Sequence, residues 1–153
     1  MNQKSTAPSA KSSEIDHSLY GKGIVFFESN DLRSAISAFK EALVYWPEDG
    51  HAWLALGNCY DADKKPRRAT KCYRQALKFE TPETRDNARY GLGVSLFDQR
   101  FFDEAIENFN QVSEAADFHN LAMENIETAR NWIETDKLQS KQELKPQILE
   151  RLH

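Results

Sequence analysis

Side chains that could carry out chemistry are present in this sequence, but their spacing forms no catalytic or metal-binding motif. Neither cysteine has a histidine placed to activate its thiol, because the histidines are scattered as His17, His51, His119 and His153. Gly21-Lys22-Gly23 lacks the longer glycine spacing and the preceding strand of a phosphate loop. Asp103 and Glu104 fall at an expected helix start, where carboxylates favour the helix dipole. We therefore predict no enzyme activity, no metal site and no cofactor.

Basic side chains gather in one short stretch instead. The predicted patch consists of Lys64, Lys65, Arg67, Arg68, Lys71 and Arg74, and Lys78 continues it. Such cations raise the local potential, so the patch could dock an acidic partner or a phosphate. We favour the alternative of a solvated face balanced by Asp61, Asp63 and Glu80. Nucleic-acid binding is not expected, because it needs flanking segments that continue the basic stripe.

Composition sets the broad class. A chain of 153 residues is long enough for one domain with a sizeable core. With 20 basic and 24 acidic residues, the net charge of -4 gives no general attraction to nucleic acid or anionic membrane. No run approaches the roughly 18 apolar residues of a membrane span, and no signal peptide is recognisable. We predict a cytoplasmic protein without membrane insertion, in which Cys59 and Cys72 are small buried side chains.

A recurring pattern of small and aromatic residues shows which elements position these side chains. Gly23, Gly57 and Gly93 are separated by 34 and 36 residues. Each glycine is followed twelve residues later by an alanine, four residues after that by an aromatic residue, and three residues further on by a small or apolar residue. In the first unit these residues are Ala35, Phe39 and Ala42, in the second Ala69, Tyr73 and Ala76, and in the third Ala105, Phe109 and Val112. Trp53, Leu56 and Tyr60 share one face at helical spacing. Each unit is therefore predicted to be two antiparallel helices that cross closely at the glycine and the alanine.

This pattern resembles the tetratricopeptide repeat. The second unit matches through Trp53, Leu56, Gly57, Tyr60, Ala69, Tyr73 and Ala76, and the third departs from the pattern with Arg89 and Leu96 at the Trp and Tyr positions. The resemblance implies an all-α fold, a right-handed α-solenoid of three helix-turn-helix units. The units are expected at about 16–49, 50–83 and 84–116, within a domain over residues 14–136.

The flanking segments are expected to differ from the repeats. Residues 1–13 are small and polar, which predicts a disordered leader, with Ser13 or Asp16 capping the first helix. Phe118, Ala122, Ile126 and Ala129 make an apolar stripe, which predicts a helix over 117–136 that caps the stack. The tail over 137–153 is interrupted by Pro146 and is left open as a short helix, a dimer contact or a frayed end.

In a stack of this family the first helix of each unit lines a concave groove. The predicted groove residues are His17, Tyr20, Ile24, Phe27, His51, Leu54, Asn58, Asp61, Asn87, Tyr90, Val94 and Phe97. Most are apolar or aromatic, so we predict a site for a peptide or protein partner, with Asn58 and Asn87 offering amides to its backbone. Burial of Phe27, Val94 and Phe97 at helix junctions is the structural alternative.

Some relatives in this family bind the terminal carboxylate of heat-shock chaperones through a set of Lys, Arg and Asn side chains. The matching positions here are Tyr20, Ile24, Ala55, Asn87 and Gly91, and none is cationic. That activity is therefore not expected.

The resemblance implies a non-enzymatic protein-binding module. Two alternatives remain open at this point. One is a small chaperone of bacterial type III secretion that holds translocator proteins, and the other is a self-assembling scaffold or homodimer joined through the repeat ends or the tail.

Overall fold

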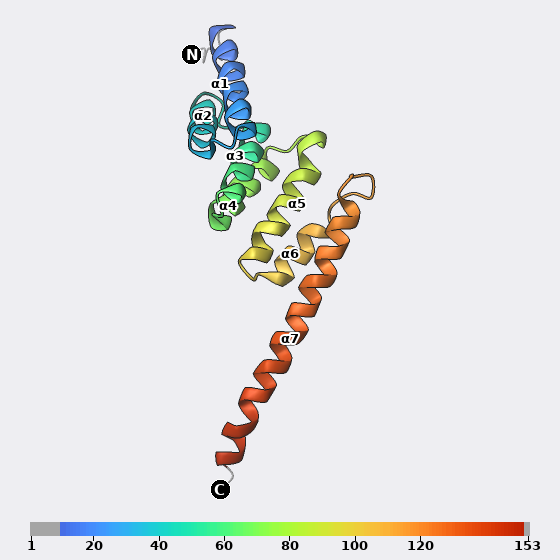
Figure 1. Cartoon of the computed structure of the whole chain (residues 1–153). Coiled ribbons are helices and arrows are strands. Elements are labelled where there is room, and N and C mark those ends of the chain that lie inside the picture. The colour runs from blue at the N-terminus through green and yellow to red at the C-terminus, as the bar shows by residue number, and fades with distance from the viewer. Residues whose placement is uncertain (1–9, 152–153) are drawn as a thin grey trace, which may run out of the picture.

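The computed structural model describes residues 10–151, with side chains described for residues 18–143. Within that range all regular secondary structure is helical, as predicted. Seven helices follow one another: α1 (Ala10–Glu28), α2 (Leu32–Tyr45), α3 (Gly50–Ala62), α4 (Pro66–Lys78), α5 (Pro82–Asp98), α6 (Phe102–Phe109) and α7 (His119–Arg151). Each of the first three pairs is a helical hairpin, and the hairpins stack in chain order (Figure 1). The fold is an α-solenoid in which α1, α3 and α5 form one layer, while α2 and α4 each pack against α3.

The predicted helix crossings are confirmed in all three hairpins. The aromatic ring of the second helix lies directly on the glycine of the first, so a Cβ added at Gly57 would lie 2.7 Å from Cε1 of Tyr73. The equivalent distances to the aromatic rings are 2.6 Å at both Gly23 and Gly93. Glycine is required at these positions because any side chain would collide with a buried ring.

The three hairpins also turn in the same way. Asn30, Lys64 and Arg100 all have positive φ, at 61°, 55° and 65°. In each turn the next backbone N–H donates to a carbonyl five residues earlier, for example from Lys65 to Tyr60 at 2.8 Å. This left-handed C-terminal cap satisfies carbonyls that would otherwise lack a partner. Asp31 is the N-cap of α2, because its carboxylate accepts from the Ser34 N–H at 3.1 Å.

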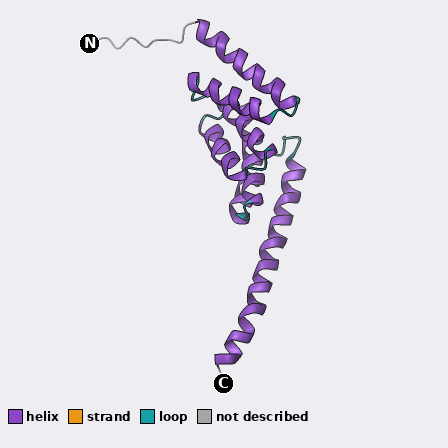
Figure 2. Ribbon diagram, turned by 60° about the vertical axis from the view of Figure 1, so that its left-hand side comes forward, coloured by secondary structure: helices purple, strands orange, loops and turns teal. Residues whose placement is uncertain are grey.

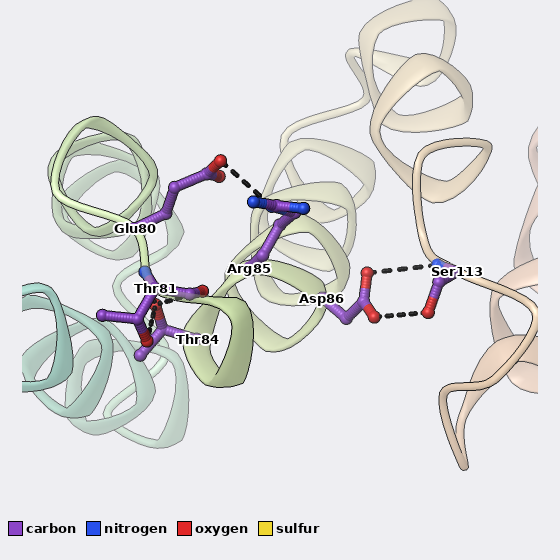
Figure 3. Close-up of polar contacts among 6 residues, drawn as sticks. All are labelled: Glu80, Thr81, Thr84, Arg85, Asp86 and Ser113. Carbon is purple, nitrogen blue, oxygen red and sulfur yellow. Dashed lines mark hydrogen bonds and ion pairs between the residues drawn. The ribbon is translucent and has the colours of Figure 1, made fainter.

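The two extra residues before the third unit lengthen its first helix. α5 has 17 residues where α3 has 13, and it begins at Pro82. The sequence assigned Pro82 to the end of the second unit, but a proline fits the first position of a helix, where its missing N–H costs nothing. Thr84 Oγ1 accepts from the Thr81 N–H at 2.9 Å and Arg85 contacts Glu80 at 3.0 Å, which together fix the start of α5 (Figure 3).

Helix bounds at the two ends of the chain differ from the prediction. α1 begins at Ala10, inside the segment 1–13 expected to be a disordered leader, so neither Ser13 nor Asp16 starts it; residues 1–9 lie outside the described part. Ala10, Lys11 and the serines are tolerated in a helix, and nothing in this stretch forces an end.

At the other end, α7 is a single helix of 33 residues rather than a capping helix over 117–136 followed by a separate tail. Its backbone continues through position 146, where a proline led us to expect an interruption. Figure 2 shows α7 running well past the hairpins. The early part packs on α6 through buried Ala122, Ile126 and Ala129, as predicted, while residues 137–143 are exposed.

The third unit ends early because α6 is short. It stops at Phe109, and the chain reaches α7 through turns at residues 110–118. The Asp86 carboxylate on α5 accepts hydrogen bonds from the Ser113 N–H at 3.1 Å and from the Ser113 hydroxyl at 2.5 Å (Figure 3). This pair ties the connecting loop to the stack. None of the described helices is both long and apolar enough to cross a membrane.

Candidate functional site

Two hollows lie along the inner layer of helices, where the sequence placed a groove. One, of about 140 Å³, lies between α1 and α3 and is lined by Tyr20, Ile24, Phe27, Phe39, His51, Leu54, Ala55 and Asn58. The other, of about 260 Å³, lies between α3 and α5 and is lined by Asn58, Asp61, Tyr73, Asn87, Tyr90, Gly91 and Val94. Asn58 belongs to both, so the hollows are neighbours along one face. Ten of the twelve predicted groove residues line this face.

This face is mainly apolar, with the polar side chains His51, Asn58, Asn87 and Asp61 among its lining residues. His51, Asn58 and Asn87 are exposed, while Tyr20, Leu54 and Tyr90 are half-buried. No lysine or arginine lines either hollow. Such a surface can bury apolar side chains of a ligand and hydrogen-bond its backbone, but it has no cation to pair with a carboxylate.

The sequence predicted Asp61 as a surface acid that balances the basic patch, but in the structure its carboxylate forms hydrogen bonds within the stack. Its oxygens accept from the hydroxyls of Ser95 at 2.7 Å and Tyr73 at 2.8 Å, which joins α3, α4 and α5. Burial raises the pKa of Asp61, although these two hydrogen bonds oppose the shift. Burial, and then the neighbouring Asp61 charge, raises the pKa of Tyr73, so this phenol stays protonated and donates. Asp61 is therefore mainly an internal hydrogen-bond acceptor, although the nearby Lys64 charge also acts to lower its pKa.

The Tyr73 hydroxyl also lies 2.9 Å from the Asn58 side-chain carbonyl. A hydroxyl has one proton, and the Asp61 carboxylate is the stronger acceptor. Asn58 therefore keeps hydrogen-bonding capacity for a ligand.

Two of the predicted groove residues are not part of these hollows. Phe97 packs edge-on against Phe102, with ring centroids 5.2 Å apart, so the alternative of a helix-junction residue is the better description. The side chain of His17 lies outside the described residues. Tyr90 lines the second hollow but is partly covered, since its ring lies 5.0 Å from that of Phe118 and its hydroxyl accepts from Asn125 at 3.4 Å.

Four lining residues were absent from the predicted set: Phe39, Ala55, Tyr73 and Gly91. A Cβ at Gly91 would lie 2.5 Å from Cζ of Tyr73, so Tyr73 packs between glycines of α3 and α5. In the sequence, the feature that could have indicated this contact is Gly91 itself, a second glycine two residues before Gly93. Its role depends on how neighbouring hairpins meet, which the pattern within one hairpin does not reveal.

The predicted basic patch lies on α4 and the turn before it. Lys65 contacts Asp63 at 2.6 Å and Arg74 contacts Glu104 at 3.3 Å, while the Arg68 guanidinium lies 5.7 Å from the centre of the Tyr60 ring. All three cationic side chains are in exposed residues. The ion pairs of the patch are formed with Asp63 and Glu104, while Asp61 is close enough for the Lys64 charge to influence its pKa.

Both cysteines are buried and free, as predicted. Burial raises the pKa of the Cys59 thiol to about 11, and burial with a smaller contribution from Cys59 raises that of Cys72 to about 12. At neutral pH both thiols are protonated and are poor nucleophiles.

Comparison with known proteins gives consistent matches. A family model described as tetratricopeptide repeat matches residues 20–83. Peroxisomal targeting signal receptors are similar in sequence: the one from Candida albicans is 30% identical over 108 residues, covering 71% of this chain and 18% of the receptor. The receptor from Eremothecium gossypii is 31% identical over 88 residues, which cover 58% of this chain and 15% of the receptor. The chain thus spans less than a fifth of the length of these relatives.

Solved structures share the fold at low identity. The first repeat domain of Spaghetti (RPAP3) bound to an HSP90 peptide has a TM-score of 0.71 at 18% identity, covering 79% of this chain and 94% of that one. The Sgt2 domain from Aspergillus fumigatus has a TM-score of 0.66 at 19% identity, and the match covers 89% of this chain and 87% of that one. The Yersinia enterocolitica type III secretion chaperone SycD has a TM-score of 0.69 at 17% identity, and the match covers 80% of this chain and 88% of that one.

Resemblance to SycD supports a common fold only, so the secretion-chaperone and self-assembly alternatives stay predictions. The family match falls on the first two hairpins, and the third repeats their glycine crossing and turn geometry. Taken with the shared fold, these observations show that the chain is a tetratricopeptide repeat protein.

Proposed function

We propose that the inner face is a non-enzymatic binding site for a peptide segment of another protein. The observation that carries this proposal is the pair of adjoining hollows, which share Asn58 and combine aromatic walls with exposed carboxamides. An extended segment laid along α1, α3 and α5 would bury apolar side chains in the hollows and pair its backbone with Asn58 and Asn87. The sequence relatives are named as receptors of a targeting signal, which supports a peptide as the ligand.

The ligand is expected to be held without a carboxylate clamp. One structural neighbour is bound to an HSP90 peptide. In the present chain neither hollow has a lysine or arginine, so a peptide whose affinity depends on a terminal carboxylate has no ion-pair partner. Apolar anchors and backbone hydrogen bonds should supply the affinity.

Peptide selection from a random display library on the full chain, followed by calorimetry, tests this function. Leu54→Asp places a charge in the first hollow and should weaken the selected peptides at least about tenfold. Asn87→Ala should weaken them by up to about tenfold through one lost hydrogen bond. Leu121→Asp, at a position that is 46% exposed on α7, is the matched control and should bind as the parent does.

Circular dichroism and urea unfolding check that each variant is folded. Unchanged affinity in folded Leu54→Asp would place the peptide elsewhere and reject the inner face as its site.

A further inference from the structure

A further hollow lies on the outer side of the solenoid, away from the proposed peptide groove. It has a volume of about 830 Å³ and runs between α2 and α4, with α3 as its floor. Its lining combines apolar side chains of α2 and α3 with basic side chains of α2 and α4. We call this the outer groove. It is larger than either inner hollow and is within the usual size range of ligand sites.

The outer groove has an apolar floor that is already formed. The Trp53 indole N–H donates to the Pro47 carbonyl at 2.7 Å, which fixes the ring. Leu56 and Tyr60 extend the same face of α3 at 3% and 8% exposure. Val44 on the α2 wall leaves 77% of its surface in water. Contact with a partner would remove this apolar surface from water without first rearranging the site.

Cations surround this floor, and no carboxylate lines it. Lys40 lies on α2, while Arg68, Lys71 and Arg74 come from α4. On the side of α4 that meets α6, Arg74 finds an acid, Glu104, at 3.3 Å. No ion pair is recorded across the outer groove between the described residues of α2 and α4. The apolar floor is therefore bordered by Lys40, Arg68 and Lys71, none of which forms an ion pair with another described residue.

The next helix explains why this charge favours a short acidic segment over a nucleic acid. In register with the repeat, α6 has Asp103, Glu104 and Glu107 at the positions that are Arg67, Arg68 and Lys71 in α4. A polyanion following the outer face would leave the basic helix and meet these acids. Tyr60 is too buried to offer a ring face for base stacking.

We propose that the outer groove is a second docking site, whose occupant is an acidic amphipathic peptide segment of a partner protein. Its apolar side chains lie on Trp53 and Val44, and its carboxylates face Lys40, Arg68 and Lys71. The site is separate from the inner peptide groove, because it uses the opposite face of α3 and the walls of α2 and α4.

Fluorescence anisotropy of the full chain with three labelled peptides tests the proposal. The peptides share leucine and tryptophan anchors at helical spacing and differ only in having Glu, Gln or Lys at the polar positions. The Glu peptide should bind about tenfold or more tightly than the Gln peptide, the Lys peptide should not bind, and added salt should weaken the Glu peptide. Val44→Asp, and Arg68→Glu combined with Lys71→Glu, should each weaken it about tenfold or more.

Matched variants keep the two faces apart. Arg130→Glu, at an exposed position on α7, repeats the charge reversal away from the groove and should leave binding unchanged. Leu54→Asp in the inner groove should also leave binding unchanged. Equal affinity for the Glu and Gln peptides, or no binding of the Glu peptide, would overturn the proposal.

Two further results would also overturn the proposal. Loss of binding in Leu54→Asp with retention in the double charge reversal would assign the peptide to the inner face. Concentration-dependent self-association that Val44→Asp abolishes would assign the outer groove to a second copy of the chain.

Discussion

At the scale of single residues, the helical turns have the same conformation but different side chains. Asn30, Lys64 and Arg100 all occupy the left-handed region, where a Cβ is unfavourable for most residues. Asparagine tolerates this conformation better than lysine or arginine. Arg100 has compensating contacts, because its guanidinium contacts Asp136 at 2.8 Å and lies 5.2 Å from the Trp132 ring centre. Lys64 is the position at which backbone strain is least offset.

Lys64→Gly should therefore raise the free energy of unfolding by about 1 kcal/mol, since glycine adopts positive φ without a Cβ clash. Asn30→Gly is the matched control and should raise it less. Urea denaturation of the two variants measures the difference. A destabilised Lys64→Gly protein would show that the left-handed residue carries no relievable strain.

At the scale of the elements, the hairpins depend on ring-on-glycine contacts. Gly57 and Gly21 are both helical glycines, yet a Cβ at Gly57 would meet the Tyr73 ring at 2.7 Å, whereas a Cβ at Gly21 has nothing within 4 Å. Tyr73 is 1% exposed and is also held by its hydroxyl, so it has little freedom to move away.

Gly57→Ala should accordingly cost about 1 to 3 kcal/mol of stability through overpacking. Gly21→Ala should instead stabilise the protein by about 0.5 to 1 kcal/mol, because alanine is the better helix former. Thermal unfolding monitored by circular dichroism compares the pair. Similar shifts in the same direction would contradict the close crossing of α3 and α4.

These crossings were predictable from sequence because they depend on residues within one hairpin. The spacing from Gly57 to Tyr73 brings the two together once both helices form. Contacts between hairpins were not predictable in this way: the bond from Ser95 to Asp61 joins residues 34 apart, and its geometry depends on how α5 is placed against α3. For the same reason the sequence located the cations Arg68, Lys71 and Arg74 of the outer groove but not its apolar floor, which depends on a space that α2 and α4 leave open above Trp53.

Chain ends were the other weak point of the sequence interpretation. Small polar residues over 10–13 and a proline at position 146 both suggested non-helical backbone, yet helix occupies both. Local propensity is a weak guide where few tertiary contacts decide the outcome. Ten of the twelve predicted groove residues line the two inner hollows, because helical periodicity fixes which side chains of α1, α3 and α5 share a face.

At the scale of the whole molecule, the buried thiols link folding to alkaline pH. The pKa of Cys59 is raised from 9.0 to about 11 and that of Cys72 from 9.0 to about 12. As pH rises above 9, the unfolded chain loses thiol protons while the folded chain keeps them. The unfolded state then binds fewer protons, so the free energy of unfolding falls with pH.

The expected slope is at most about 1.4 kcal/mol per pH unit for each thiol. Urea denaturation between pH 8 and pH 10 measures it, before tyrosine ionisation in the unfolded state adds to the fall. Cys72→Ala should show a shallower slope than the parent, regardless of its stability at neutral pH. Identical slopes would mean that Cys72 ionises equally in both states.

Helix α7 adds reach to this small solenoid. Beyond Asp136, whose carboxylate pairs with Arg100, it runs to Arg151 over about 22 Å at 1.5 Å of rise per residue. A helical strut of this kind behaves as a semi-rigid spacer, unlike a flexible tether. Any tag or fused domain attached past Arg151 would therefore be held clear of both grooves, with its direction set by the packing of Ile126 and Ala129 on the last hairpin.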